Sequence, residues 1–163
     1  MPLAAAALSM NSEIDRIVAS IPRTEEELQS WNLVERWANV AKIFFASSVI
    51  PVWTPVGLDA GKAMWISTAL LEVGSPQELN LSAMASAFKA FASLAAIPGN
   101  TILPPPPAAV VVPPITPLIL LPLNALAPSP SPLPSTIALH SILLAWAVTG
   151  TQTIPPALPV PWS

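Results

Sequence analysis

Few side chains in this sequence could perform acid–base, nucleophilic or metal chemistry. The chain holds one histidine, His140, and no cysteine. Without cysteine, disulfides, thiol catalysis and zinc–thiolate sites are excluded. A catalytic histidine needs a nucleophile or an acidic residue that orients it, and the carboxylate nearest to His140 in the sequence is the distant Glu78. We therefore interpret His140 as a residue of a helix face or an interface.

Two short motifs look like ligand sites but match them poorly. Glu25, Glu26 and Glu27 are consecutive, and consecutive helical residues point in different directions, so these carboxylates do not converge on a cation. The segment at 57–62, GLDAGK, lacks the G-x-x-x-x-G-K-[ST] spacing of a phosphate loop, because Ala63 follows the lysine. The sequence thus predicts no enzyme activity, no cofactor or metal site and no small-molecule substrate.

The low charge of the chain limits its partners. Charged residues make up 9% of the 163 residues and apolar residues 53%, against about 25% charged in an average protein. The six lysines and arginines are scattered, whereas binding to nucleic acid through counterion release needs several clustered cations. Nucleic acid is therefore excluded as a partner, and other proteins are the expected ones.

The distribution of charge and proline divides the chain near Pro98. All charged residues lie between Glu13 and Lys89, and residues 90–163 have none. Sixteen of the 22 prolines lie between Pro104 and Pro161. From this change we predict four regions: a helical domain at 1–98, a Pro-rich extended strap at 99–134, a short helix at 135–150 and an extended C-terminal tail at 151–163.

Helix start signals and apolar spacing organise the first region. Ser12-x-x-Asp15 and Thr24-x-x-Glu27 have the form of capping boxes, and Ser75-Pro76-Gln77-Glu78 is a further start signal. Gly74 follows a helical pattern and suits a C-terminal cap. The predicted helices run from Ser12 to Ile21, from Thr24 to Ser47 or Val49, from Leu58 to Val73 and from Ser82 to Ile97.

The second region reads as extended chain with one short helix. Pro104 to Pro107 favour polyproline II, and Val110 to Val112 lie between prolines. A helix is expected from Ser135 or Thr136 to Gly150, with Ile137, His140, Leu143, Leu144 and Ala147 on one side. The predicted fold class is mainly α: a small N-terminal helical bundle followed by a long Pro-rich extended arm containing one short helix.

The positive mean hydropathy of +0.62 requires a membrane role to be considered. Residues 104–127 are apolar and long enough to span a bilayer, but they contain eight prolines. Each proline removes a backbone donor and interrupts a helix, and lipid does not tolerate exposed non-helical backbone. A membrane-spanning segment is therefore not expected.

Tryptophans and the strap supply the candidate partner-binding residues. Tryptophan is enriched at interface hot spots, although these indoles could equally close over the helical core. The strap lacks the Arg or Lys that usually flanks PxxP ligands of SH3 or WW domains, which disfavours that kind of partner. The residues that we predict to bind other subunits are Trp53, Pro104, Pro105, Pro106, Pro107, Val111, Ile119, Leu120, Trp146 and Trp162.

Four segments resemble small structural proteins of contractile-tailed bacteriophage virions. They are MASAFKAFASLAA (84–96), the strap, LLAWAVTGT (143–151) and the terminal PVPWS (159–163). The resemblance implies a virion location, in baseplate, neck or capsid. We expect a non-enzymatic structural protein that clamps neighbouring subunits with its uncharged C-terminal half. The alternative is a membrane- or surface-associated adaptor that uses this apolar half.

Overall fold

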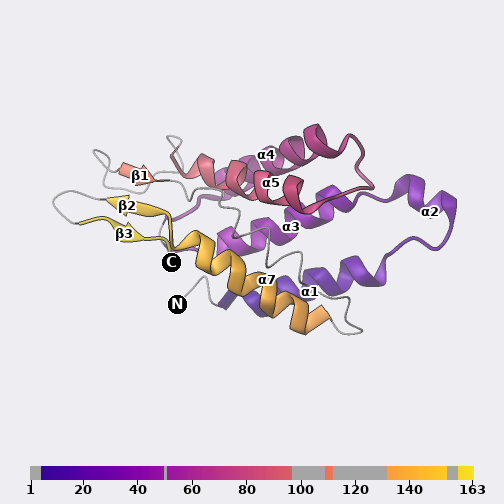
Figure 1. The fold of residues 1–163 in the computed structure, drawn as a ribbon, viewed down its shortest axis with the longest axis horizontal. Coiled ribbons are helices and arrows are strands. Elements are labelled where there is room, and N and C mark those ends of the chain that lie inside the picture. Colours follow the sequence, from indigo (N-terminus) through magenta and orange to yellow (C-terminus); the bar gives the residue numbers. More distant parts are fainter. Residues whose placement is uncertain (1–4, 50, 97–108, 112–131, 154–157) are drawn as a thin grey trace.

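The computed structural model describes residues 5–49, 51–96, 109–111, 132–153 and 158–163. Helices dominate these residues, which confirms the mainly α fold class (Figure 1). The helices are α1 Ala6–Ala19, α2 Glu25–Ser30, α3 Leu33–Ala46, α4 Pro55–Val73, α5 Leu81–Ser93, the 3-10 helix η2 Leu94–Ala96, and α7 Pro132–Ala147. The strands are β1 Ala109–Val111, β2 Thr151–Thr153 and β3 Val160–Pro161.

The long helices pack side by side in the spatial order α7–α1–α3–α4–α5. The helix α7 therefore contacts α1, although α2 to α5 and the strap region lie between them in the sequence. The short helix α2 projects at the end of the molecule opposite the sheet (Figure 1), and none of its residues is buried. This order makes α1 the element that joins the charge-free C-terminal helix to the rest of the bundle.

Aromatic rings fill the centre of the bundle. Phe45 of α3 stacks on Phe91 of α5 with ring centroids 4.4 Å apart. The Trp53 ring lies 5.5 Å from Phe45, and the Trp146 ring of α7 lies 6.3 Å from it. The single core cluster also includes Trp162 near the C-terminus. Residues on both sides of Pro98 thus contribute to the same core.

The contact between α4 and α5 depends on small residues. Gly57, Gly61, Trp65 and Ala69 recur every fourth residue and are buried. A Cβ atom on Gly61 would lie only 2.4 Å from a ring carbon of Phe91, so glycine allows the two helices to approach. The segment at 57–62 is therefore a helical packing surface, and its glycines do not form a phosphate loop.

Helix α7 begins earlier than predicted, and its buried face overlaps the predicted one at His140, Leu143 and Ala147. It starts at Pro132 instead of Ser135 or Thr136. Leu139, His140, Leu143, Trp146 and Ala147 are buried, whereas Ile137, expected on this face, is half exposed. Of the predicted arm at 99–134, residues 109–111 form β1 and 132–134 belong to α7. The rest of the arm lies outside the described residues.

The tail, predicted as extended, contributes two strands to a three-stranded antiparallel sheet of order β1-β2-β3. Val110 pairs with Gln152, and Gln152 pairs with Val160 on the other side. Pro161 lies on the edge strand β3, the place in a sheet that tolerates a missing donor. The Trp162 amide donates to the Gly150 carbonyl over 3.0 Å, and the Val49 amide donates to the Ser163 carbonyl over 2.7 Å. These bonds bring the C-terminus back onto the bundle.

Two predicted helix boundaries in the first region are wrong for local reasons. Helix α1 begins at Ala6, and the Ser12 hydroxyl donates to the Leu8 carbonyl instead of capping a helix. The predicted helix from Thr24 is broken at Trp31 and Asn32, because the Asn32 side chain accepts from the Glu35 amide over 2.9 Å and caps α3. Asparagine competes with helical hydrogen bonds in this way.

The start signal at Ser75 also fails. This segment forms a turn, and α5 begins at Leu81 with Asn80 as its cap. The Ser75 hydroxyl contacts the Gln77 amide and side chain. The Pro76 carbonyl accepts from the Val34 amide over 3.2 Å. The turn therefore satisfies a donor in the first turn of α3, a long-range role that a local motif does not reveal.

Candidate interaction surface

The three tryptophans predicted to bind a partner lie inside the protein. Trp53, Trp146 and Trp162 are 8%, 3% and 1% exposed, respectively. They pack in the core cluster with Phe45 and Phe91. In this fold their rings are not available to a partner. They close the helical core instead, which was the alternative that the sequence left open for them.

The remaining predicted partner-binding residues belong to the strap. Val111 is the last residue of β1 and pairs with Thr151 of β2. Pro104, Pro105, Pro106, Pro107, Ile119 and Leu120 lie outside the described residues.

The described residues gather little of the chemistry that an active site requires. His140 is buried, and its ring centroid lies 6.2 Å from that of Phe44. Within the described ranges no group of three His, Cys, Asp or Glu residues is placed to hold a metal ion. His140 therefore lies in the apolar interior between α7 and α3.

Two hollows open on the charged half of the molecule. The first, of about 450 Å³, lies among the ends of α1, α2 and α3. In its wall the Arg36 guanidinium lies 4.6 Å from the Trp31 ring centroid, and the Glu27 carboxylate accepts from the Arg23 amide. The second, of about 470 Å³, includes Glu72 and Glu78 in its wall. Neither wall, as described, contains a histidine or cysteine.

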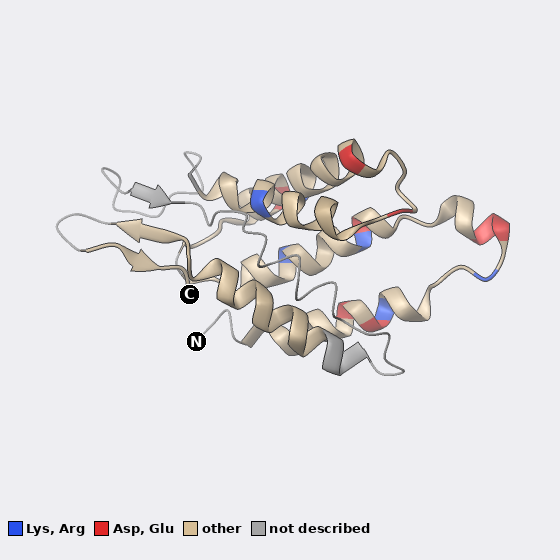
Figure 2. Cartoon of the chain, in the orientation of Figure 1, with Lys and Arg blue, Asp and Glu red and all other residues tan. Residues whose placement is uncertain are grey.

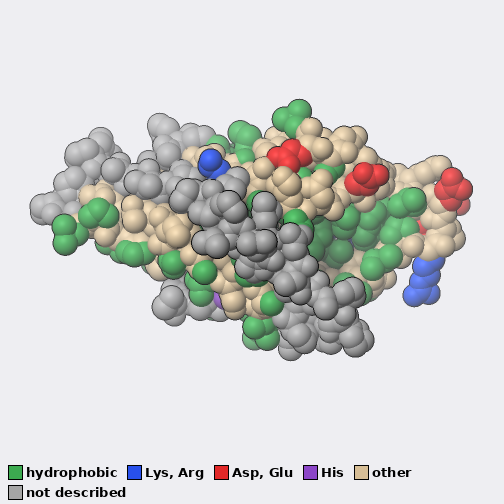
Figure 3. Space-filling model, viewed as in Figure 1, with side chains coloured by type: hydrophobic (Ala, Val, Ile, Leu, Met, Phe, Trp, Pro, Cys, Tyr) green, Lys and Arg blue, Asp and Glu red, His purple; other side chains and the backbone are tan. Residues whose placement is uncertain are grey.

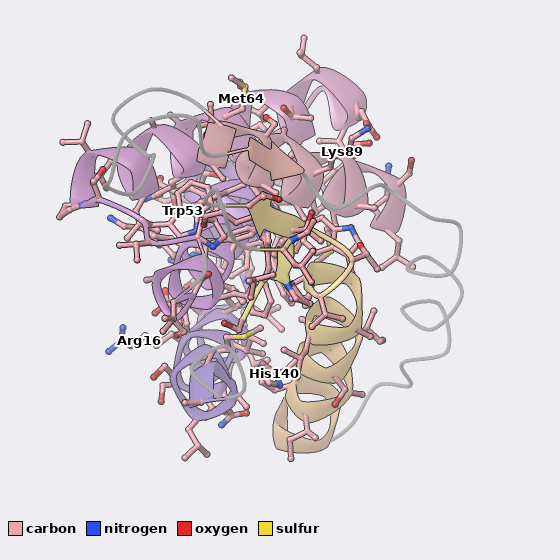
Figure 4. All side chains as sticks on the ribbon, turned by 90° about the vertical axis from the view of Figure 1, so that its left-hand side faces the viewer. Arg16, Trp53, Met64, Lys89 and His140 are labelled. Atoms are coloured by element: carbon pink, nitrogen blue, oxygen red, sulfur yellow. The ribbon has the colours of Figure 1, made fainter. Side chains whose placement is uncertain are left out.

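Charge is distributed unevenly over the fold. Figure 2 shows acidic and basic residues on α1 to α5, whereas α7 and the described strands carry none. Among the described residues, the end of the molecule formed by the sheet therefore carries no charged side chain. In the view onto this end, the labelled Lys89 and Arg16 lie near the periphery (Figure 4).

The uncharged end exposes several large apolar side chains. Leu158 is 82% exposed, and Val49, Val52, Val148 and Val160 are between 39% and 48% exposed. We call these five residues the sheet-end surface. Figure 3 shows hydrophobic side chains at the outer tip of β3. Exposed apolar side chains on one end of a protein can mark a contact with a partner.

Backbone hydrogen bonds hold the sheet-end surface together. The bond between Val49 and Ser163 fixes the turn after α3 against the C-terminus. The bond between Trp162 and Gly150 fixes β3 against the end of α7, two residues beyond Val148. Trp162 anchors this arrangement because its ring is buried in the core. The backbone at Val49, Val148 and Val160 is thus held by hydrogen bonds.

Sequence reasoning missed Leu158, Val148 and Val49 as surface residues. The absence of charge in 90–163 indicated the correct half of the chain for two of them. Which apolar residues point outward depends on α7 docking against α1 and on the return of β3, and these are tertiary features. Tryptophan, the residue type chosen as an interface marker, was used here as the anchor of the core.

No protein family, curated protein or solved structure matches the chain. In the part of the chain that the structure describes, no helix combines the length and apolar character needed to cross a bilayer.

Proposed function

We propose that this protein is a non-enzymatic structural component of a protein assembly, which docks on a neighbouring subunit through the sheet-end surface. The observation that carries the proposal is an exposed apolar surface on an uncharged end, with Leu158 at 82% exposure. A surface without charged side chains avoids the cost of desolvating them when a partner covers it. The partner is therefore expected to be a protein with an apolar contact face.

The fold suits this role because it orders the docking residues in advance. Val49 is held by its hydrogen bond to Ser163, and Val160 is held by its pairing with Gln152. The prolines at 159 and 161 restrict the backbone on both sides of Val160. A segment ordered before binding loses less conformational entropy when it docks. Burying one leucine side chain contributes about 1.5–3 kcal/mol, so Leu158 alone can change affinity strongly.

The assembly that we propose is a virion, on the resemblance of the sequence to small phage structural proteins. The uncharged C-terminal half is the part that clamps neighbouring subunits in this proposal. Its described portion contains β1, α7, β2 and β3, and Val148 after α7, Leu158 before β3 and Val160 in β3 are exposed.

A matched pair of variants tests the docking surface. Leu158→Asp places a charge on the sheet-end surface, and Leu8→Asp places the same charge on α1, where Leu8 is 73% exposed. Each tagged chain is supplied during particle assembly, and its amount in purified virions is measured by immunoblotting. We expect Leu158→Asp to reduce incorporation by about tenfold or more, since 1.4 kcal/mol corresponds to tenfold, and Leu8→Asp to leave it unchanged.

Equal incorporation of Leu158→Asp and the unaltered chain would refute docking through this surface. Flotation with phosphatidylcholine vesicles separates the alternative adaptor role. If the unaltered chain floats and Leu158→Asp does not, the surface binds lipid, and the structural proposal is replaced by the adaptor. Hydrogen exchange supplies a second measure: residues 148–153 and 158–163 should be protected more strongly in the particle than in the free chain.

A further inference from the structure

The hollow among the ends of α1, α2 and α3 has two arginines, Arg23 and Arg36, in its wall. We call it the arginine hollow. It lies at the end of the molecule where α2 projects, opposite the sheet (Figure 1). Its volume of about 450 Å³ falls within the usual range of ligand pockets, about 300–1,000 Å³. The hollow is therefore large enough to receive a side chain of a bound peptide.

The ion pairs of the fold leave these two arginines without a counterion. Three of the six lysines and arginines form ion pairs among the described residues, and they are Arg16, Lys42 and Lys62. The other three form none, and two of them, Arg23 and Arg36, share the wall of the arginine hollow. Glu35, which precedes Arg36 in the sequence, is paired with Lys62 instead. The hollow thus gathers positive charge that the described part of the fold does not neutralise.

Stacking on Trp31 holds the Arg36 side chain in place. The guanidinium carbon lies 4.6 Å from the centroid of the Trp31 ring, and Trp31 is itself only 8% exposed and belongs to the core cluster. The stack uses the face of the guanidinium, while its five N–H donors point outward in its plane. A carboxylate accepts two such parallel donors at once. Arg36 is therefore oriented in advance for a carboxylate.

The rest of the wall selects the kind of anion. Glu27 also lines the hollow, and its Oε2 atom accepts from the Arg23 amide over 2.7 Å. Two cations and this one acid leave a single net positive charge, which suits a singly charged group better than a phosphate dianion. The apolar part of the wall includes Ala19 and Ile21, and Ile21 is 57% exposed. An acid carried on an apolar stem, with an apolar neighbour, fits this combination.

From the unpaired arginines, the stacked guanidinium and the apolar wall, we infer that the arginine hollow binds a glutamate side chain in an acidic peptide segment of a partner protein. Arg36 binds the carboxylate, Arg23 attracts it from the rim, and Ile21 contacts an apolar residue next to the acid. A single ion pair at a partly exposed site contributes little, so the binding is weak and decreases with added salt. The inference goes beyond docking through the sheet-end surface, because it concerns the opposite end of the molecule and a charged ligand.

Two peptides that differ in one group test the recognition of the carboxylate. They are acetyl-Gly-Leu-Glu-Leu-Gly-amide and the same peptide with glutamine in place of glutamate, which has the same shape and no charge. Each is titrated into the full-length, nitrogen-15-labelled chain, and NMR follows the Arg36 Nε–H signal and the backbone amides of the hollow. We expect saturable shifts with the glutamate peptide and an affinity about tenfold or more lower for the glutamine peptide. Equal affinity of the two peptides would overturn the inference.

Matched arginine variants locate the binding. Arg36→Gln should weaken the glutamate peptide by about tenfold or more, and Arg36→Lys, which keeps the charge but not the planar pair of donors, should also weaken it. Arg23→Gln changes an exposed position and should cost about two- to threefold. It keeps the test valid if Arg36→Gln fails to fold. Arg16→Gln is the control, since it removes an equal charge from outside the hollow, where the Arg16 side chain is 74% exposed.

Three results would overturn the assignment. If Arg16→Gln weakens the glutamate peptide as much as Arg36→Gln does, general attraction between charges explains the binding. If inorganic phosphate shifts the same signals at concentrations as low as the peptide does, the hollow is a general anion site. Leu158→Asp separates this inference from the sheet-end surface: it should bind the glutamate peptide as the unaltered chain does, and a loss of binding would place the peptide at the sheet end instead of the arginine hollow.

Discussion

The hydroxyl of Thr136 donates a hydrogen bond to Oδ1 of Asn11 over 3.1 Å, joining residues 125 positions apart. Thr136 lies near the start of α7 and is only 1% exposed, and Asn11 lies in the middle of α1. The bond therefore connects the uncharged half of the chain to the charged half inside the fold. Docking of α7 is specified by a polar contact as well as by apolar packing.

Replacing Thr136 with valine tests the contribution of this bond. Valine keeps the shape but leaves the Asn11 carbonyl oxygen without this donor, so the free energy of unfolding should fall by about 1–2 kcal/mol. Urea denaturation measures the change. Thr68→Val on α4 is the control, because Thr68 is half-buried and makes no side-chain hydrogen bond among the described residues, and should change stability little. If Thr136→Val lowers the free energy of unfolding equally in the chain with Asn11 and in an Asn11→Ala chain, the hydrogen bond contributes nothing to stability.

A chain that ends at residue 98 tests whether the first region folds alone. Removing α7 and the C-terminal strands takes Leu139, Leu143, Trp146 and Trp162 out of the core. The faces of α1, Phe45 and Phe88 that they cover would then meet water. Because truncating one large core side chain costs about 2–5 kcal/mol, losing these four is comparable to the whole stability of a small domain, about 5–15 kcal/mol.

We expect the truncated chain to lack a cooperative thermal transition, measured by near-ultraviolet circular dichroism and calorimetry. The full-length chain is the reference. A sharp transition in the truncated chain would instead support a self-sufficient domain at 1–98, as the change in composition near Pro98 suggests.

Local chemistry predicted the parts of the fold that depend on neighbours in sequence. The Thr24 side chain accepts from the Glu27 amide over 3.2 Å, as its capping motif indicated. Gly74 adopts a left-handed conformation with φ of 75° and ends α4, as its position after an apolar helix indicated. Both features follow from side-chain and backbone preferences within one turn.

Features set by distant contacts could not be predicted in this way. The Pro76 carbonyl is used by Val34 of α3, so a convincing start signal becomes a turn. The exposure of the tryptophans was undecided in sequence, because the core positions of Trp146 and Trp162 require α7 and β3 to fold back onto α1 and α3. The sheet-end surface is a product of the same return, and the sequence indicated only its lack of charge.

The close approach of Gly61 to Phe91 makes Gly61→Ala a sensitive test of the α4–α5 contact. The new methyl group would lie 2.4 Å from the ring. Phe91 is fully buried and stacked on Phe45, so it has little room to move. Alanine favours a helix over glycine by about 1 kcal/mol, but overpacking costs about 1–3 kcal/mol.

We therefore expect Gly61→Ala to lower the midpoint of urea denaturation. Phe91→Leu alone also destabilises the protein. The loss in free energy of unfolding caused by Gly61→Ala should, however, be much smaller in the Phe91→Leu chain than in the unaltered chain. Equal costs in the two backgrounds would show that the ring does not limit the packing of these helices.

Gln152 offers a buried site where a polar residue can be removed with a gain in stability. It lies in the central strand β2 and is 3% exposed, and its Oε1 atom has no hydrogen-bond partner in the described part of the structure. A buried acceptor without a partner costs about 1–3 kcal/mol. Methionine has a similar length and no such acceptor, so Gln152→Met should raise the free energy of unfolding by about 1 kcal/mol.

Gln29→Met, at an exposed position of α2, is the control and should change the free energy of unfolding little. Urea denaturation of both variants decides the matter: a loss of stability in Gln152→Met would mean that the amide makes an interaction on which the sheet depends.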